Sequence, residues 1–322
     1  LVGTDIKVNQ TYRGPLLKTI EQIAESFKPW NPGTELTVGL FSSVVPEFDE
    51  RAFREALVNA FGHRDYSLLG RVRVLVDDAG LTIANPGGFV EGINVHNLLT
   101  AEPRGRNPCL MDALKRTGLA ERTGRGIDRI FEGALNYGRP LPDYSRSNRR
   151  GVSVLLPRSV PDKAFVELLA EERERSGKSM SLDGLLILDK LKSERRCGFD
   201  VLSGSLDMSD QRLRTVLGQL TEAGLVESAG VGARRTYMLG AKVYRRSGRA
   251  MEYVRQSDID RVRYPELIIE LMHEQKSVSK NDVMELLHLE ENQAYYQLRK
   301  LVLEGRAKKV GSGRNVRYAA VR

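Results

Sequence analysis

The stretch REALVNAFGHRDY, residues 54–66, has the pattern of an amphipathic helix with two separate stripes. Apolar residues recur every three or four positions, as on a helix face that packs into a core: Phe53, Ala56, Leu57, Ala60 and Phe61. Glu55, Asn59 and His63 follow one another at intervals of four, so they share a face beside that stripe. An acid, an amide and an imidazole along the edge of a buried face indicate a candidate site.

The composition is that of a soluble globular protein with an excess of positive charge. The 322 residues suffice for two or three domains, and 41% of them are hydrophobic and 29% charged. The net charge of +8 favours an anionic partner, with nucleic acid as the first candidate. A mild positive excess is also explained by solubility alone.

Cysteine usage and hydropathy bear on the compartment. Cys109 and Cys197 stand far apart, without a C-x-x-C motif or a Cys/His cluster, which argues against a disulfide framework and a structural zinc site. No apolar run approaches the roughly 20 residues that span a bilayer, and no signal peptide is recognisable. We therefore expect a cytoplasmic protein without a membrane partner.

Up to about residue 158, segments of helix and strand pattern are mixed. Helices are predicted over residues 14–30, 54–66, 106–119 and 124–138. Strands are predicted over residues 34–46, 72–76, 81–85 and 151–157, with a turn at Asp78-Ala79-Gly80. This order predicts an α/β sandwich in which helices cover one face of a sheet.

From about residue 181 the sequence repeats itself with a constant offset of 81 residues. The identities are Leu217, Leu220, Gly224, Gly230, Gly232 and Tyr237 with Leu298, Leu301, Gly305, Gly311, Gly313 and Tyr318. The same offset lays LILDKL (186–191) over LIIELM (267–272). We predict two copies of one domain, at 181–245 and 246–322, joined to the first domain (1–158) by a linker at 159–180.

Each copy has the pattern helix, helix, turn, helix and two-stranded hairpin, and Ser209 is placed to begin the third helix of the first copy. This pattern resembles the winged helix-turn-helix family, whose third helix enters the DNA major groove and whose wing approaches phosphates. The resemblance implies DNA contacts by the third helix and the two wings: Gln211, Arg212, Arg214, Arg234, Arg235, Arg314 and Arg317. Dimerisation is the alternative for the second copy, because Glu290 and Glu291 would face phosphates there.

Three stretches of the first domain suit a nucleotide site. An Asn carbonyl at position 59 can bind Mg²⁺, and Glu55, one turn earlier, can take a proton from water. The strand LTIAN ends at Asn85 and is followed by Pro86-Gly87-Gly88, where the backbone can lie close to a ligand. In ERTGRGIDRI, glycines precede a helix, whose free N–H groups attract phosphate. A turn or a helix cap is the structural alternative for each.

In this order and spacing the three stretches resemble the GHKL ATPase (Bergerat) fold of the gyrase B subunit, MutL, heat-shock chaperones and histidine kinases. More closely, REALVNAFGHRDYS, IANPGG and RNPCLMDALKRTGLAERTGRGIDRI resemble a bacterial family of transcriptional regulators labelled RecG-related helicases. The resemblance covers about residues 1–158. Members of that family carry an N-terminal AlbA-like, Schlafen-type domain, and since the chain begins at Leu1, we expect such a domain upstream.

The resemblance implies ATP and Mg²⁺ as cofactors, with Glu55 as general base and Asn59 as Mg²⁺ ligand. Asn85 would contact the adenine amino group, and Gly87 and Gly88 would make room for the base. The phosphates would lie against Gly124, Arg125 and Gly126, and against Arg104 and Arg106 in the lid segment TAEPRGRNP (100–108), unless these two arginines face solvent. The resemblance assigns no chemistry to His63, Arg64 and Asp65, for which the expected role is to hold the helix end by hydrogen bonds.

The main departure from the family is Asn85, where better-known members have Asp. Asn donates as well as accepts, so the base selectivity could be looser, or binding could be lost and only a scaffold for protein interaction remain. The preferred hypothesis is a transcriptional regulator that binds Mg-ATP and DNA and forms a homodimer, with slow hydrolysis at most. Motor activity is disfavoured because Glu172 replaces the first glycine of the P-loop pattern before GKS (177–179). Histidine kinase activity is disfavoured because no phosphoacceptor helix precedes the ATPase stretches.

Overall fold

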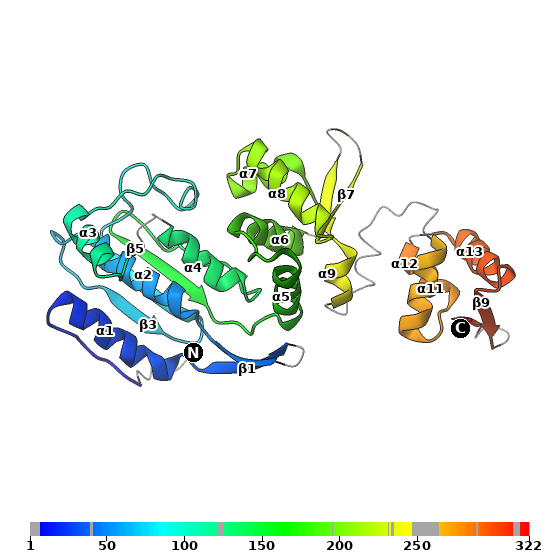
Figure 1. Ribbon diagram of the computed structural model, residues 1–322, viewed down its shortest axis with the longest axis horizontal. Helices are drawn as coiled ribbons and strands as arrows, with labels where there is room; N and C mark the ends of the chain where they lie inside the picture. Colours follow the sequence, from blue (N-terminus) through cyan, green and yellow to red (C-terminus); the bar gives the residue numbers. More distant parts are fainter. Residues whose placement is uncertain are drawn as a thin grey trace. The chain divides into compact units, whose positions relative to one another are not determined.

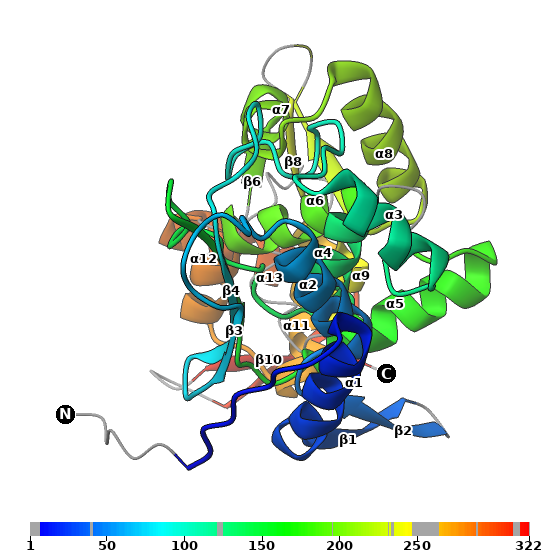
Figure 2. The same ribbon diagram turned by 90° about the vertical axis from the view of Figure 1, so that its left-hand side faces the viewer.

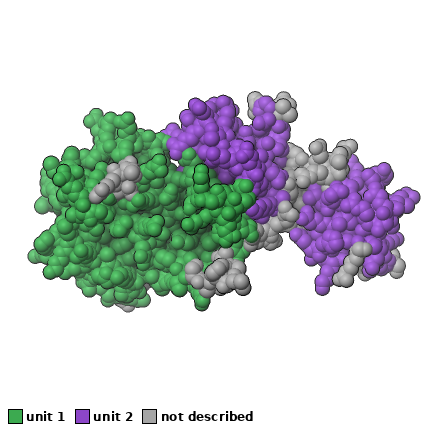
Figure 3. Space-filling model, in the orientation of Figure 1, with its two compact units in different colours: residues 1–185 green, residues 186–322 purple. Residues whose placement is uncertain are grey.

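The computed structural model describes residues 7–38, 41–120, 125–194, 196–230, 232, 235–246, 264–287, 289–311 and 316–321. It divides into two compact units, Leu1–Leu185 and Leu186–Arg322 (Figure 3). Helices and small antiparallel sheets are combined in a mixed α/β fold (Figure 1). This agrees with the predicted mixture of helices and strands. None of the helices in the described ranges has both the length and the apolar character that a membrane crossing requires.

The sheet of the first unit contains β3 (Arg73–Val76), β4 (Gly80–Pro86) and β5 (Gly151–Pro157) in the order β3-β4-β5, with both pairs antiparallel. Leu81 and Ile83 of β4 are buried and lie opposite Leu156 and Val154 of β5. Their alternation along the strand places them on one face, since side chains of a strand alternate between the two faces. This face of the sheet forms part of the core.

Helices α2 (Glu50–Gly62) and α4 (Gly126–Leu135) lie on the same side of this sheet (Figures 1 and 2). Asp49 begins α2, because its Oδ1 accepts hydrogen bonds from the backbone N–H groups of Arg51 and Ala52, both at 2.9 Å. The two helices approach closely at Gly133, where an added Cβ would lie 2.7 Å from the Cβ of Ala52. The absence of a side chain at Gly133 therefore sets the separation of α2 and α4.

Further elements of the first unit surround this core. They are α1 (Leu16–Phe27), the 3₁₀ turn Lys28–Trp30, the hairpin of β1 (Gly33–Val38) and β2 (Phe41–Pro46), α3 (Pro108–Arg116) and α5 (Lys163–Ser176). The ring of Phe27 in α1 stacks on that of Phe53 in α2, with centroids 4.0 Å apart. Helix α5 occupies the segment 159–180 that was expected as a linker; Asp162 caps its start, and Gly177, with a left-handed φ of 70°, ends it.

The first copy of the repeat contains α6 (Leu182–Glu194), β6 (Arg196–Gly198), α7 (Phe199–Leu206), α8 (Asp210–Glu222), β7 (Val226–Ala229) and β8 (Thr236–Leu239), followed by α9 (Ala241–Arg246). Its strands form a sheet in the order β6-β8-β7. The second copy contains α11 (Tyr264–Gln275), α12 (Lys280–Leu287), α13 (Glu291–Leu303), β9 (Ala307–Val310) and β10 (Arg317–Ala320).

The structure confirms the repeat. An offset of 81 carries α7, α8, β7 and β8 onto α12, α13, β9 and β10 at both ends of each element. Cys197 pairs with Tyr237 in the first copy, and Val278 pairs with Tyr318 at the same two positions of the second. Gly224 and Gly305, which follow the third helix, have φ values of 68° and 71°. Where both residues of an identical pair are described, they lie at buried positions or at glycines of positive φ. Such positions allow two stretches with few identical residues to adopt the same fold.

Candidate nucleotide site

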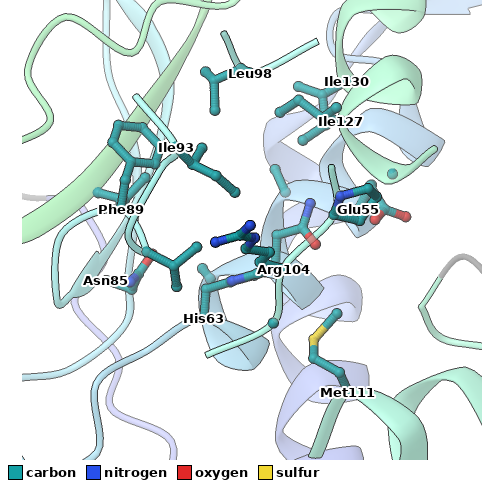
Figure 4. Close-up of a pocket in the computed structure, with 18 of the residues that line it drawn as sticks. Glu55, His63, Asn85, Phe89, Ile93, Leu98, Arg104, Met111, Ile127 and Ile130 are labelled. Atoms are coloured by element: carbon teal, nitrogen blue, oxygen red, sulfur yellow. The ribbon is translucent and has the colours of Figure 1, made fainter. Parts of the chain in front are cut away.

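The first unit contains a cavity of about 380 Å³, within the range of about 300–1,000 Å³ typical of small-molecule sites (Figure 4). Its walls come from α2, α4, the β4-β5 part of the sheet, α3 and the segment 88–105. Most lining side chains are apolar, among them Phe89, Ile93, Leu98, Met111, Ile127 and Ile130. A few polar groups lie among them, which is the usual composition of a binding site for an organic ligand.

The polar stripe of α2 faces this cavity. Glu55, Asn59 and His63 all line it, which confirms that the three residues share one face of the helix. Glu55 is buried, with 4% of the residue exposed. Burial lowers the pKa of His63, and the positive charge of Arg106 lowers it further, so the imidazole is neutral near pH 7. The wall formed by α2 thus presents an acid, an amide and a neutral imidazole to a ligand.

At the end of β4, Asn85 also lines the cavity and is 6% exposed. Its Nδ2 donates to the backbone oxygens of Pro86 at 3.0 Å and of Gly87 at 3.5 Å. These bonds fix the orientation of the side-chain amide, because the amino end is held by the turn that follows the strand. The carbonyl end is then the part of Asn85 that can bind a ligand.

The two glycines after β4 have different surroundings. Gly88 lines the cavity, whereas Gly87 does not. Gly87 has a φ of 91°, and a Cβ at this position would lie 2.6 Å from the Cβ of Asp65. A Cβ on Gly88 would lie 2.7 Å from the backbone oxygen of Asn148. Both glycines are therefore required by neighbouring chain segments, which the sequence pattern alone did not indicate.

Asp65 and Arg106 connect the end of α2 to the turn after β4. The N–H of Asp65 donates to the oxygen of Pro86 at 2.9 Å, and Arg106 donates to the oxygen of Gly88 at 2.7 Å. Nη1 of Arg106 lies 3.5 Å from the carboxylate of Asp65. Hydrogen bonds from Ser67 lower the pKa of Asp65, and Arg106 contributes to the same effect. Arg106, predicted to reach phosphates, lies outside the cavity lining and holds this turn.

Arg64 and Asn107 complete these connections. The side-chain Nδ2 of Asn107 donates to the backbone oxygens of Gly62 at 2.9 Å and of Arg64 at 2.8 Å, which ties the start of α3 to the end of α2. The guanidinium of Arg64 donates to the oxygen of Gly70 at 2.8 Å and lies over the ring of Tyr66. We expected the residues after α2 to form hydrogen bonds that hold the helix end. Arg64 and Asp65 form such bonds with the backbone oxygens of Gly70 and Pro86.

The start of α4 lies against Glu55. A Cβ on Gly126 would overlap Oε1 of Glu55 and lie 2.7 Å from its Cδ, so the carboxylate occupies the space beside the first residue of the helix. A carboxylate is favoured there by the positive end of the helix dipole. Gly126 lines the cavity, Arg125 is exposed and outside the lining, and Gly124 lies outside the described residues.

Arg104 and Tyr144 also belong to the cavity wall. Figure 4 shows the side chain of Arg104 between Asn85 and Glu55, although the residue as a whole is exposed. Tyr144 is buried, and its pKa is raised by burial and by the negative charge of Glu55. Sequence reasoning missed Tyr144 and the apolar residues of 89–98, because no local pattern distinguishes them from ordinary core or loop residues.

In the described ranges, no group of three or more His, Cys, Asp or Glu side chains is placed to hold a metal ion by itself. Asn59 and Glu55, whose side chains carry oxygen atoms, line the cavity from consecutive turns of α2. Such a pair suits Mg²⁺ that arrives with a nucleotide, because the ion keeps waters and phosphate oxygens as its other ligands. The residues present therefore fit an ion that arrives with a ligand better than a resident metal.

The residues predicted to contact DNA have different surroundings. Gln211, Arg212 and Arg214 are exposed on the first turns of α8, whose N-cap is Ser209 as predicted. Arg214 is paired with Asp210 at 3.2 Å and stacked on Phe199. Arg235 is exposed, and Arg234 and Arg314 lie outside the described residues. Arg317 donates to the backbone oxygen of Ser277 at 2.7 Å and is held within its own copy.

Comparison with known proteins identifies a family and similar solved structures. Residues 70–156 match the family described as "Putative ATP-dependent DNA helicase recG C-terminal". The crystal structure of the DIP2311 protein from Corynebacterium diphtheriae is similar, with a TM-score of 0.60 and 22% identity over 98% of this chain. The chain spans 57% of the length of that protein. A search of curated proteins found no match. The comparisons therefore support an ATPase-like domain over residues 70–156.

Proposed function

We propose that the protein is a transcriptional regulator that binds Mg-ATP in the cavity of a GHKL-type domain and binds DNA through its winged-helix tail. The observation that carries the nucleotide part is the convergence of Glu55, Asn59, Asn85, Arg104 and Gly126 on one cavity. These residues come from four segments of the chain. The alternative is a DNA-binding regulator whose GHKL-like domain no longer binds nucleotide and serves protein interaction or dimerisation.

The chemistry of the walls assigns each residue a task. Asn59 would hold Mg²⁺ through its carbonyl oxygen, and Mg²⁺ would neutralise phosphate charge and orient the phosphates. Glu55 would accept a proton from the attacking water, and the overlap of its carboxylate with the Cβ position of Gly126 places it at the start of α4. The helix start and Arg104 supply positive charge for the phosphates. Hydrolysis on this arrangement would be slow and would change dimerisation or domain arrangement.

The orientation of Asn85 supports adenine as the base. Since the Nδ2 of Asn85 donates to Pro86 and Gly87, its Oδ1 is left to accept a hydrogen bond from the ligand. The exocyclic amino group of adenine donates such a bond, whereas guanine carries an oxygen at that position. The held amide thus offers the same acceptor as the Asp of better-known relatives, and ATP should be preferred to GTP.

Calorimetric binding of ATP and GTP, with and without Mg²⁺, tests the nucleotide part. We expect ATP to bind at least about tenfold more tightly than GTP, because a lost hydrogen bond in a buried site costs about 1–3 kcal/mol.

Asn59→Ala should weaken Mg-ATP binding by about 10–100-fold, the usual effect of disturbing a metal site. Its matched control is Asn136→Ala, since Asn136 is exposed at the end of α4. If the wild type, Asn59→Ala and Asn136→Ala all fail to bind ATP, only the alternative of a domain that no longer binds nucleotide remains.

The DNA part rests on α8 and the first wing, where Gln211, Arg212 and Arg235 are exposed. In winged-helix proteins these elements approach the groove and the phosphates. We expect DNA affinity to fall about 10³-fold between 50 and 200 mM salt if about six phosphates are contacted. Arg212→Glu with Arg235→Glu should weaken binding to all sequences alike and reduce the salt dependence.

The control for this experiment is Arg173→Glu, which makes the same change of charge on the exposed side of α5, outside both repeats. It should alter DNA affinity only slightly. Fluorescence anisotropy with labelled duplexes measures the DNA affinity of the wild type, the double variant and the Arg173→Glu control. An undiminished affinity of the double variant would show that the first repeat is not the DNA contact.

A further inference from the structure

Tyr144 places a hydroxyl group in an apolar part of the cavity wall. The residue lines the cavity and is 6% exposed. Its ring is held on two sides, because it stacks on Phe131 with centroids 6.4 Å apart and is tilted against Phe89 with centroids 6.3 Å apart. These ring contacts involve no oxygen atom, and a phenylalanine would form them equally well. The hydroxyl therefore needs an explanation of its own.

Within the described part of the chain, the hydroxyl of Tyr144 has no hydrogen-bond partner. It differs in one respect from the Nε atoms of Arg64, Arg106 and Arg139, which also lack a partner there: those atoms are enclosed by the protein, whereas the Tyr144 oxygen keeps accessible surface. The open space that Tyr144 lines is the cavity. Since the O–H group of a buried tyrosine normally finds a partner, a ligand in the cavity is the source that the structure leaves open.

The backbone fixes the face of the sheet on which Tyr144 lies. Asp143 and Leu155 of β5 exchange two backbone hydrogen bonds, at 2.8 and 2.9 Å, so the segment that contains Tyr144 runs beside β5. Val154 and Leu156 are buried on the core face, and Leu155 between them therefore lies on the other face. Asp143 shares that outer face with Leu155. Tyr144, the next residue, lies on the core face beside Val154.

Asn85 and Tyr144 lie at two sides of one apolar floor. Asn85 pairs with Val152 across β4 and β5, and Val152 and Val154 both line the cavity. Two strand spacings, about 10 Å in all, separate the backbone of β4 from the segment that contains Tyr144. A planar base can lie on this floor, with the carbonyl oxygen of Asn85 toward one edge and the hydroxyl of Tyr144 toward another.

The hydroxyl of Tyr144 is a hydrogen-bond donor at every physiological pH. Burial raises its pKa, and the negative charge of Glu55 raises it further, so the proton stays on the oxygen. The ligand atom opposite must then be an acceptor. Phosphate oxygens have charged partners in Arg104 and in the start of α4, whereas the wall around Tyr144 is aromatic and aliphatic. A neutral acceptor, such as a ring nitrogen of a base, suits this wall.

We propose that Tyr144 is a specificity-determining residue of the nucleotide site, and that its hydroxyl donates a hydrogen bond to a ring nitrogen of the base. Asn85 accepts from the amino group at one edge of the base, and Tyr144 donates at another. Tyr144 lies outside the three stretches that carry the resemblance to the GHKL fold. The inference rests on the proposed nucleotide binding and adds a contact to it.

The first test is Tyr144→Phe in the full chain, which removes the oxygen atom and keeps the ring. ATP affinity, measured by calorimetry, should fall at least about tenfold, because the ligand loses a hydrogen bond in a buried site. The melting temperature of the ligand-free variant should equal that of the wild type or exceed it, since the hydroxyl has no partner among the described residues. Tyr137→Phe is the matched control: Tyr137 follows α4 and is not part of the cavity lining, so ATP affinity should not change.

The second test changes the ligand instead of the protein. In the 1-deaza, 3-deaza and 7-deaza analogues of ATP, a CH group replaces one ring nitrogen of the base. With one of these analogues the wild type should bind as weakly as Tyr144→Phe binds ATP. Tyr144→Phe should lose no further affinity for that analogue, because the two changes remove the same hydrogen bond and are not additive.

The outcomes separate this inference from the proposed function. A wild type that does not bind ATP removes both. If the wild type binds ATP and Tyr144→Phe binds it equally well, the nucleotide site stands and the role of Tyr144 is overturned. The role is also overturned if the variant binds ATP and all three analogues more weakly by the same factor, since no ring nitrogen is then the partner. A lower melting temperature of the ligand-free variant overturns it as well, because the hydroxyl would then have a partner within the protein.

Discussion

On the proposed mechanism, Gly126→Ala should lower ATP turnover at least about 100-fold, the effect expected when the general base, Glu55, is displaced. A Cβ at residue 126 would overlap Oε1 of Glu55, so the carboxylate has to leave its place beside the start of α4. The clash involves the end of a side chain that can rotate, and the protein should therefore stay folded. Phosphate release in single-turnover conditions measures the effect, and Mg-ATP binding should fall less than turnover does.

Glu55→Ala is the reference for this experiment, because it removes the carboxylate without adding an atom near α4. On the proposed mechanism it spares Mg-ATP binding and abolishes turnover, and Gly126→Ala should resemble it in turnover. If Gly126→Ala turns over ATP like the wild type while Glu55→Ala does not, the position of the carboxylate against α4 is unimportant. If both variants keep wild-type turnover, Glu55 is not the general base.

Gly133→Ala should destabilise the first unit by about 1–3 kcal/mol, the usual effect of overpacking a core. The new Cβ would lie 2.7 Å from the Cβ of Ala52 and 2.9 Å from the Cβ of Asp49. Neither atom can rotate away, because each is attached directly to the backbone at the beginning of α2. The two helices would have to separate. Thermal or urea unfolding followed by circular dichroism measures the change.

Gly218→Ala is the matched control for Gly133→Ala. Gly218 is also within a helix, but a Cβ there would meet no atom within 4 Å. Alanine is favoured over glycine in helices by about 1 kcal/mol, so this variant should be neutral or more stable than the wild type. A Gly133→Ala protein as stable as Gly218→Ala would show that the spacing of α2 and α4 can relax without cost.

Helix α2 and the repeat show what local patterns can predict. The stripe of Glu55, Asn59 and His63 follows from helical periodicity, and the structure places all three on the cavity. The repeat was visible because buried leucines and glycines of positive φ keep their spacing. The mixed α/β character followed from the order of helix and strand patterns.

Helix α5 lies within the segment 159–180, for which we expected a linker. Asp162 at its N-cap and Gly177 at its C-cap are nevertheless the ordinary start and end signals of a helix. Its apolar residues include Leu168, which is buried. Lys163, Arg173, Glu174 and Arg175 are exposed, whereas Glu172 is buried and pairs with Arg175.

The sequence by itself indicated most of the helices and strands, the offset of 81 between the two copies and the shared face of Glu55, Asn59 and His63, because each depends on spacing along the chain. Only the tertiary structure decided that Gly87 packs against Asp65 and that Arg106 holds the turn after β4. These contacts join residues more than 15 positions apart, and their geometry depends on the path of the whole backbone. The same reason explains why the apolar residues of the cavity wall were not predicted. The sequence does not distinguish a residue that lines a cavity from another buried residue.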